Sequence, residues 1–184
     1  LEEKPVSNQQ LKNGLRRLTC KILIVPVLCG SAFKKRAVHN LIDTVIDYLP
    51  SPLDIPCAVG QDPDDADVKI EAAPDDNAKA CSLAFKLWTD PYVGKLVFFR
   101  VYSGKFRKGD TIYNPRTNKR ERVSRVMMLQ ADKREEVDVV YSGDIAALVG
   151  VKNITTGDTL CDEDHPVLLE PPTFPEPVIS MAVE

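Results

Sequence analysis

The chain has 184 residues, of which 43% are hydrophobic and 28% are charged, and its formal net charge is −3. These values are typical of a soluble globular protein with one ordinary domain and part of another, or with two small domains. They exclude a membrane-spanning helix, because the longest apolar stretch, 22–29, is far too short to cross a bilayer, and the start shows no signal-peptide pattern. The first residue is Leu1 rather than Met, which predicts a piece of a longer protein.

The cysteines favour a reducing compartment. There are five, at positions 20, 29, 57, 81 and 161, with irregular spacing and no CxxC pair. A secreted disulfide framework would show an even number at regular spacing. We therefore expect a cytoplasmic protein.

The charges are segregated along the chain. Segments 1–50 and 80–160 carry net charges of +4 and +5, whereas segments 51–79 and 161–184 each carry −6. A basic compact unit between acidic connectors indicates a polyanionic partner such as RNA. A solvated surface of mixed charge is the alternative, and charge alone does not separate the two.

The first 50 residues predict the closing elements of a doubly wound α/β domain. Ser7 followed by Gln10 matches a capping box, so we expect a helix over 7–20. The continuous apolar run 22–28 predicts a buried strand, and the apolar positions of 38–49 predict a second helix that Pro50 ends. A single strand cannot form a sheet, so only a remnant of such a domain is present.

The remaining sequence predicts a β-rich unit between two linkers. Segment 51–79 is rich in Pro and Asp and is expected to be a linker or an extended strap, and segment 166–177 a second linker. The fold class expected is mainly β, a closed barrel of six or seven strands preceded by the α/β remnant. Turn signals separate the expected strands, which are 81–88, 95–102, 111–114, 121–129, 144–150 and 159–162, with a further strand over 178–183.

Several signatures occur in the order in which they occur in one family. They are VPVLCGSAF (25–33), YLPSPLD (48–54), WTDPYVGKL (88–96), FFRVYSG (98–104), KRERV (119–123), REEV (134–137), GDIAA (143–147), TTGDTLCD (155–162) and FPEPVIS (174–180). Together they resemble bacterial elongation factor G, a translational GTPase. Release factor three and the ribosomal protection proteins share the architecture and are the alternative parents, but YVGKL, REE and GDIAA are most similar to elongation factor G.

The resemblance implies a domain order. Residues 1–50 would be the end of the GTP-binding domain, 51–79 an acidic linker, 80–165 the second-domain barrel, and 166–184 a linker with the first strand of the third domain. It also implies that the longer parent binds GTP and Mg²⁺ and moves tRNA and mRNA through the ribosome. We expect no catalytic residues, metal or cofactor in this chain, because the GxxxxGK[ST] loop is absent and Asn118-Lys119 is not followed by the NKxD pattern.

One element of a nucleotide site is expected to remain. Ser31, Ala32 and Phe33 resemble the loop whose backbone N–H contacts the guanine oxygen, and the small residues at 30 and 31 permit close approach. An ordinary strand-to-helix loop is the alternative. One such donor without a phosphate loop could not hold GTP.

The barrel is expected to dock on RNA. The resemblance implies contacts with small-subunit ribosomal RNA and with neighbouring domains of the same chain, and no membrane or DNA partner. Lys and Arg neutralise backbone phosphates, and strand alternation would place Arg120 and Arg122 on one face. The candidate contacts are Lys105, Arg107, Lys108, Lys119, Arg120, Arg122 and Arg125.

Other motifs favour ordinary structural roles. Cys161 and His165 have a CxxxH spacing, but a zinc site needs four ligands and no second pair exists. Trp88, Phe98 and Phe99 could stack on bases, although core packing is expected for most of them, with Phe98 and Phe99 on opposite faces of a strand.

Overall fold

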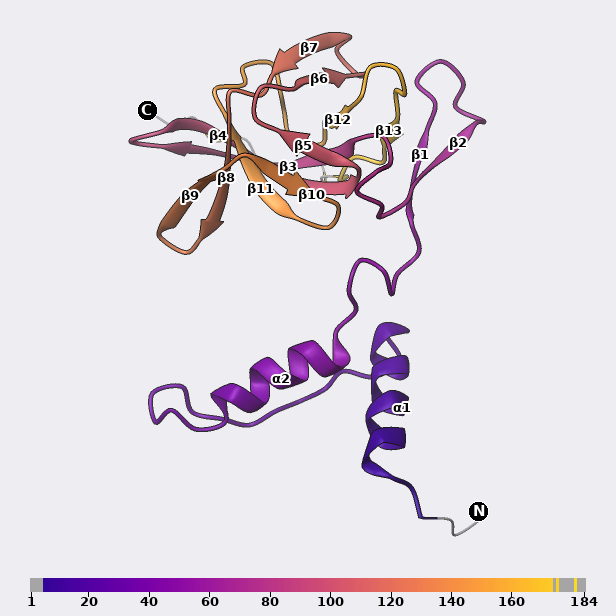
Figure 1. Ribbon diagram of the computed structural model, residues 1–184, viewed down its shortest axis with the longest axis vertical. Helices are drawn as coiled ribbons and strands as arrows, with labels where there is room; N and C mark the ends of the chain where they lie inside the picture. Colours follow the sequence, from indigo (N-terminus) through magenta and orange to yellow (C-terminus); the bar gives the residue numbers. More distant parts are fainter. Residues whose placement is uncertain (1–4, 174, 176–180, 182–184) are drawn as a thin grey trace. The chain divides into compact units, whose positions relative to one another are not determined.

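The computed structural model describes residues 5–173, 175 and 181, and it divides into two units, Leu1–Pro56 and Cys57–Glu184 (Figure 1). The first unit contains two helices, α1 (Asn8–Cys20) and α2 (Val38–Tyr48). The capping box is present, since the Gln10 N–H donates to Ser7 Oγ and the Ser7 N–H donates to Gln10 Oε1. Both predicted helices are confirmed.

The prediction of a strand over 22–28 is wrong. The structure assigns no strand there, and the side chains of Ile22, Val25 and Val27 are 79–87% exposed. An extended segment becomes a strand only by pairing with another, and the described residues of the first unit offer it no neighbouring strand.

The second unit begins with a small sheet in a segment expected to be a linker. β1 (Ala58–Gln61) and β2 (Lys69–Ala72) form a hairpin, and β13 (Leu168–Leu169) pairs with β1 in the order β13-β1-β2. A Cβ at Gly60 would lie 2.4 Å from the Val167 side chain, so β1 approaches the later segment closely only because residue 60 is glycine. The expected linkers over 51–79 and 166–177 thus contain paired strands.

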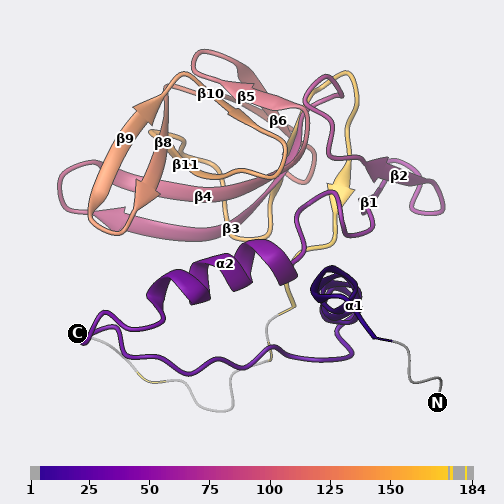
Figure 2. The same ribbon diagram turned by 60° about the horizontal axis from the view of Figure 1, so that its bottom comes forward.

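The main sheet has eight antiparallel strands in the order β7-β6-β12-β3-β4-β11-β8-β9, and it curls around a core (Figure 2). A separate two-stranded ladder joins β10 and β5. The mainly β class is confirmed, although the strand count differs from the six or seven expected. The bounds are β3 (Cys81–Asp90), β4 (Gly94–Ser103), β5 (Lys105–Arg107), β6 (Thr111–Asn114), β7 (Lys119–Arg122), β8 (Arg125–Gln130), β9 (Lys133–Val137), β10 (Val139–Tyr141), β11 (Ile145–Val149) and β12 (Thr159–Cys161).

Five of the six strands predicted between 81 and 162 are confirmed within two residues at either end. The sixth, expected over 121–129, is divided into β7 and β8 around Val123 and Ser124. Val123 leaves the ladder because its N–H donates to the Asp110 carbonyl and its carbonyl accepts from the Gly109 N–H. The strand expected over 178–183 falls mostly on 178–180 and 182–183, outside the described residues.

The core follows strand alternation. In β4, Phe99 is fully buried while Phe98 is only partly buried, as expected for neighbours on opposite faces. The Phe99 ring meets that of Phe106 edge to face at 5.5 Å between centroids. The largest fully buried side chains are Phe99, Phe106, Leu96, Leu148, Ile154 and Leu160.

The strands at the two ends of the main sheet are the most highly charged. β7 has the sequence KRER and β9 the sequence KREEV, and most of their side chains are exposed. Among the described residues each pairs on one side only, β7 with β6 and β9 with β8.

Candidate functional site

Basic side chains gather where the turn after β5 meets the junction of β7 and β8. The Gly109 N–H donates to the Val123 carbonyl at 2.8 Å, which brings Lys108 next to the segment that carries Arg122 and Arg125. Lys108 Nζ lies 2.5 Å from Glu136 Oε1 of β9. Hydrogen bonding to Glu136 and its charge raise the pKa of Lys108, whereas the nearby Arg125 opposes this. We call Lys108, Arg122 and Arg125 the basic cluster.

Lys119 and Arg120 lie at the other end of β7. Both Arg120 and Arg122 are exposed, with the half-buried Glu121 between them, so the predicted alternation is confirmed. Arg120 is paired with Glu163 through two hydrogen bonds, one of them 2.6 Å from Nε to Oε2. The charge of Arg120 is therefore partly neutralised within the chain.

The remaining two predicted contacts lie on β5. Arg107 is exposed beside Lys108, and its N–H donates to Asp110 Oδ2 at 2.9 Å. Lys105 stands at the far end of β5, opposite Tyr141 of β10. The structure thus places Arg107 next to the basic cluster, and it separates Lys105, Lys119 and Arg120 from it.

Sequence reasoning missed a buried polar cluster around Asp158, whose side chain is 1% exposed. Its carboxylate accepts hydrogen bonds from Arg116 Nε at 2.5 Å, from Asn114 Nδ2 at 2.8 Å and from the Thr155 N–H at 2.8 Å. Burial alone would raise the pKa of Asp158, but these three donors together hold it below its usual value. Asn114-Pro115 and Gly157-Asp158 are typical turn sequences, and nothing in their spacing indicates that the two turns meet.

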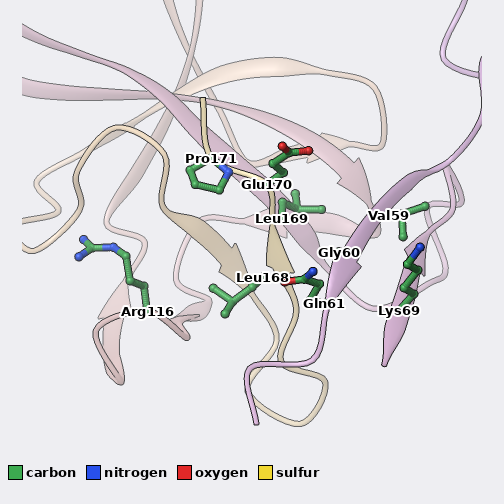
Figure 3. A pocket seen from close by; sticks show the side chains of 9 residues that line it. All are labelled: Val59, Gly60, Gln61, Lys69, Arg116, Leu168, Leu169, Glu170 and Pro171. Carbon is green, nitrogen blue, oxygen red and sulfur yellow. The ribbon is translucent and has the colours of Figure 1, made fainter. Parts of the chain in front are cut away.

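A cavity of about 580 Å³ lies beside the small sheet (Figure 3). Its lining is partly apolar, from Leu168 and Pro171, and Lys69 and Arg116 stand on opposite sides of it with Leu168 between them (Figure 3). Arg116 forms an ion pair with Asp158, so the charge of one of the two cationic side chains of this cavity is already neutralised within the chain.

The Ser31–Phe33 loop forms a tight turn in the first unit. The N–H of Ser31 donates to the Arg36 carbonyl at 3.1 Å, and the N–H of Arg36 donates back at 2.9 Å. Phe33 is 97% exposed. Among the described residues, the N–H groups of Ala32 and Phe33 donate to no acceptor within the turn. This is compatible with a contact to guanine but does not test it, so the interpretation stays a prediction.

The part of the chain that the structure describes contains neither a metal-ligand group nor a membrane-spanning helix. No group of three or more His, Cys, Asp or Glu side chains there could hold a metal ion, and Cys161 is buried whereas His165 is exposed. No helix in those residues is long and apolar enough to cross a membrane.

Two comparisons with known proteins bear on the chain, one over part of the second unit and one over nearly its whole length. Residues 94–161 match the profile of the family described as Elongation factor Tu domain 2. A crystal structure of a protein from Thermus thermophilus is similar to this chain with a TM-score of 0.70 and 18% sequence identity, over 97% of this chain and 24% of that one. An identity this low establishes a shared fold alone. Residues from β4 to β12 thus resemble the second domain of a translation elongation factor, and the chain spans about a quarter of the longer protein that shares its fold.

Proposed function

We propose that this chain is part of a translational GTPase of the elongation factor G type, which drives movement of tRNA and mRNA on the ribosome. The match of residues 94–161 to the second domain of elongation factor Tu carries this proposal. The ordered signatures that extend from 25 to 180 support the finer assignment to elongation factor G. GTP, Mg²⁺ and hydrolysis belong to the longer protein, and this chain supplies no catalytic group of its own.

Within that function, the second unit acts as a docking module for ribosomal RNA of the small subunit. Exposed Lys and Arg neutralise phosphates and release counterions, so several of them on one surface produce affinity that depends on salt. The basic cluster suits this role best, because Arg122 and Arg125 are exposed, Arg125 is close enough to Lys108 to act on its pKa, and a hydrogen bond joins Val123, next to Arg122, to Gly109, next to Lys108. Arg120 and Lys108 contribute less than Arg122 and Arg125, since binding a phosphate would compete with their pairing to Glu163 and Glu136.

Co-sedimentation of the chain with small ribosomal subunits, at low and at moderate salt, tests the proposal. We expect binding that weakens as salt rises, and at least a tenfold loss of affinity at low salt for the double variant Arg122→Glu, Arg125→Glu. The slope of log affinity against log salt should fall by about 2, because about one phosphate contact is lost per residue.

Two variants sharpen this test. Lys152→Glu reverses one charge, as each half of the double variant does, at an exposed position outside the basic cluster, and it should bind almost as the parent does. Arg120→Glu should weaken binding less than Arg122→Glu. Unchanged binding of the double variant would contradict the role of the cluster. Absence of binding at low salt would mean that the barrel only relays movement between neighbouring domains.

A further inference from the structure

Cys81 of β3 and Cys161 of β12 lie directly opposite each other on two antiparallel strands. The Asp162 N–H donates to the Ala80 carbonyl at 3.1 Å, so the ladder hydrogen bonds flank the cysteine pair and do not join it. Facing residues in such a position have Cα atoms about 4.5 Å apart, and their side chains leave the same face of the sheet. The two thiols are therefore neighbours.

This spacing permits a disulfide bond. Disulfides join Cα atoms about 4.4–6.8 Å apart, a range that includes the separation of this pair. Both cysteines are free thiols in the structure and both are buried. The Cys161 thiol donates weakly to the Tyr113 carbonyl at 3.7 Å, and rotation about its Cα–Cβ bond would exchange this contact for a bond to Cys81.

A small cavity gives an oxidant a place beside Cys81. It has a volume of about 130 Å³, and Cys81 lines it. One water occupies about 30 Å³, so a molecule of the size of hydrogen peroxide fits. The other titratable groups that line the same cavity are Glu71, Lys79 and His165. Burial raises the pKa of the Cys161 thiol, and the negative charge of Asp162, the residue after it, raises that pKa further.

We propose that Cys81 and Cys161 form a redox-modification site, at which hydrogen peroxide converts the two thiols into a disulfide between β3 and β12. The Cys81 thiolate attacks a peroxide oxygen, the O–O bond breaks, and a sulfenic acid and one water result. The Cys161 thiolate then attacks the Cys81 sulfur, the S–S bond forms, the S–O bond breaks and a second water leaves. Each sulfur gives up one electron to the peroxide, and the two thiol protons end in the waters.

The burial of Cys81 and Cys161 slows their oxidation. Burial, with a smaller contribution from Cys161, raises the pKa of Cys81 to about 12, and burial raises the pKa of Cys161 as well. Because the thiolate is the nucleophile, the reaction rate should rise about tenfold for each pH unit between pH 7 and pH 9. Cys29 is exposed, so an oxidant reaches it directly, and it should react first.

The test uses the full chain with Cys20, Cys29 and Cys57 replaced by Ser, which leaves the buried pair as its only cysteines. Millimolar hydrogen peroxide at pH 9 should remove both thiols together. Tryptic digestion should then yield peptide 80–86 joined to peptide 153–184, two hydrogen atoms lighter than the sum of the separate peptides. The oxidised protein should melt at least about 5 °C higher than the reduced protein, and dithiothreitol should reverse the shift.

Two matched variants complete the test. Adding Cys81→Ser or Cys161→Ala to the triple variant should abolish the joined peptides and the rise in melting temperature. The proposal is overturned if both thiols stay free at pH 9 while the protein remains folded. It is also overturned if they oxidise singly to sulfinic acids without a link, or if the link joins two different molecules.

Discussion

The two units of the chain differ in how they use their apolar side chains. Among the described residues, every buried hydrophobic side chain lies in the second unit, whereas Thr19 is the one buried side chain of α1 and α2 has none. Leu41, Ile42, Val45 and Ile46 of α2 are 47–70% exposed although their spacing is that of a core-facing helix. An amphipathic pattern therefore predicts that a helix forms, but says nothing about what covers it.

The largest expected effect comes from the core of the second unit. Phe99→Ala should lower the free energy of unfolding of that unit by about 3–5 kcal/mol, because the substitution removes a fully buried ring and leaves a cavity. Urea denaturation followed by the fluorescence of Trp88, the only tryptophan, measures this. Ile42→Ala in α2, where the side chain is 52% exposed, should change the same transition by less than about 0.5 kcal/mol. Equal losses would refute the contrast between the units.

A smaller effect is expected at Asp158. Asp158→Asn should destabilise the second unit by about 2 kcal/mol at neutral pH, because a buried carboxylate with three donors is replaced by an amide that cannot accept from all of them. Urea midpoints across a pH series would measure the difference.

The sign of the pH dependence follows from the lowered pKa of Asp158. The unfolded state binds the proton first, so the contribution of the carboxylate is fully present above the unfolded pKa of about 4. It is lost as pH falls through the lower pKa of the folded state. The stability gap between parent and variant should therefore narrow below about pH 4, and a gap that stays constant down to pH 2 would contradict the assignment.

The smallest effect is expected at the start of α1. Ser7→Ala removes one side of the capping box and should weaken the first turn by about 1 kcal/mol. Hydrogen exchange at the Gln10 amide, which donates to Ser7 Oγ, should become about fivefold faster. Asn8→Ala, one residue further on, leaves the cap intact and should not change the exchange rate of the Gln10 amide. An equal increase of that rate in both variants would mean that the Ser7 cap does not protect the amide.

The elements that could be predicted from sequence are those with a local cause. The capping box, the alternation of β4 and the turn signals between strands each depend on residues close together in the chain, and all were identified. The pairing of β13 with β1 was missed because it brings Gly60 against Val167, more than a hundred positions away. The division of the strand expected over 121–129 was missed for the same reason, since it depends on hydrogen bonds to Asp110 and Gly109.

The candidate site follows the same rule. The alternation of Arg120 and Arg122 is local and was predicted correctly. Sequence could not show that Glu163 forms an ion pair with Arg120, or that Lys108 lies beside Arg125. Nor could it show that Asp158 joins two turns. Each of these contacts forms only when the sheet curls and brings distant segments together. The facing of Cys81 and Cys161 depends likewise on the register of β3 with β12.

The charged strands at the two ends of the main sheet have a consequence for the behaviour of the protein in concentrated solution. A strand with one unpaired side offers N–H and C=O groups to any other chain, and rows of such contacts grow into fibrils. In β7 and β9 the exposed Lys, Arg and Glu side chains repel a second copy that approaches in register. The charged side chains of β7 and β9 therefore oppose edge-to-edge aggregation of the protein, in addition to any role in binding.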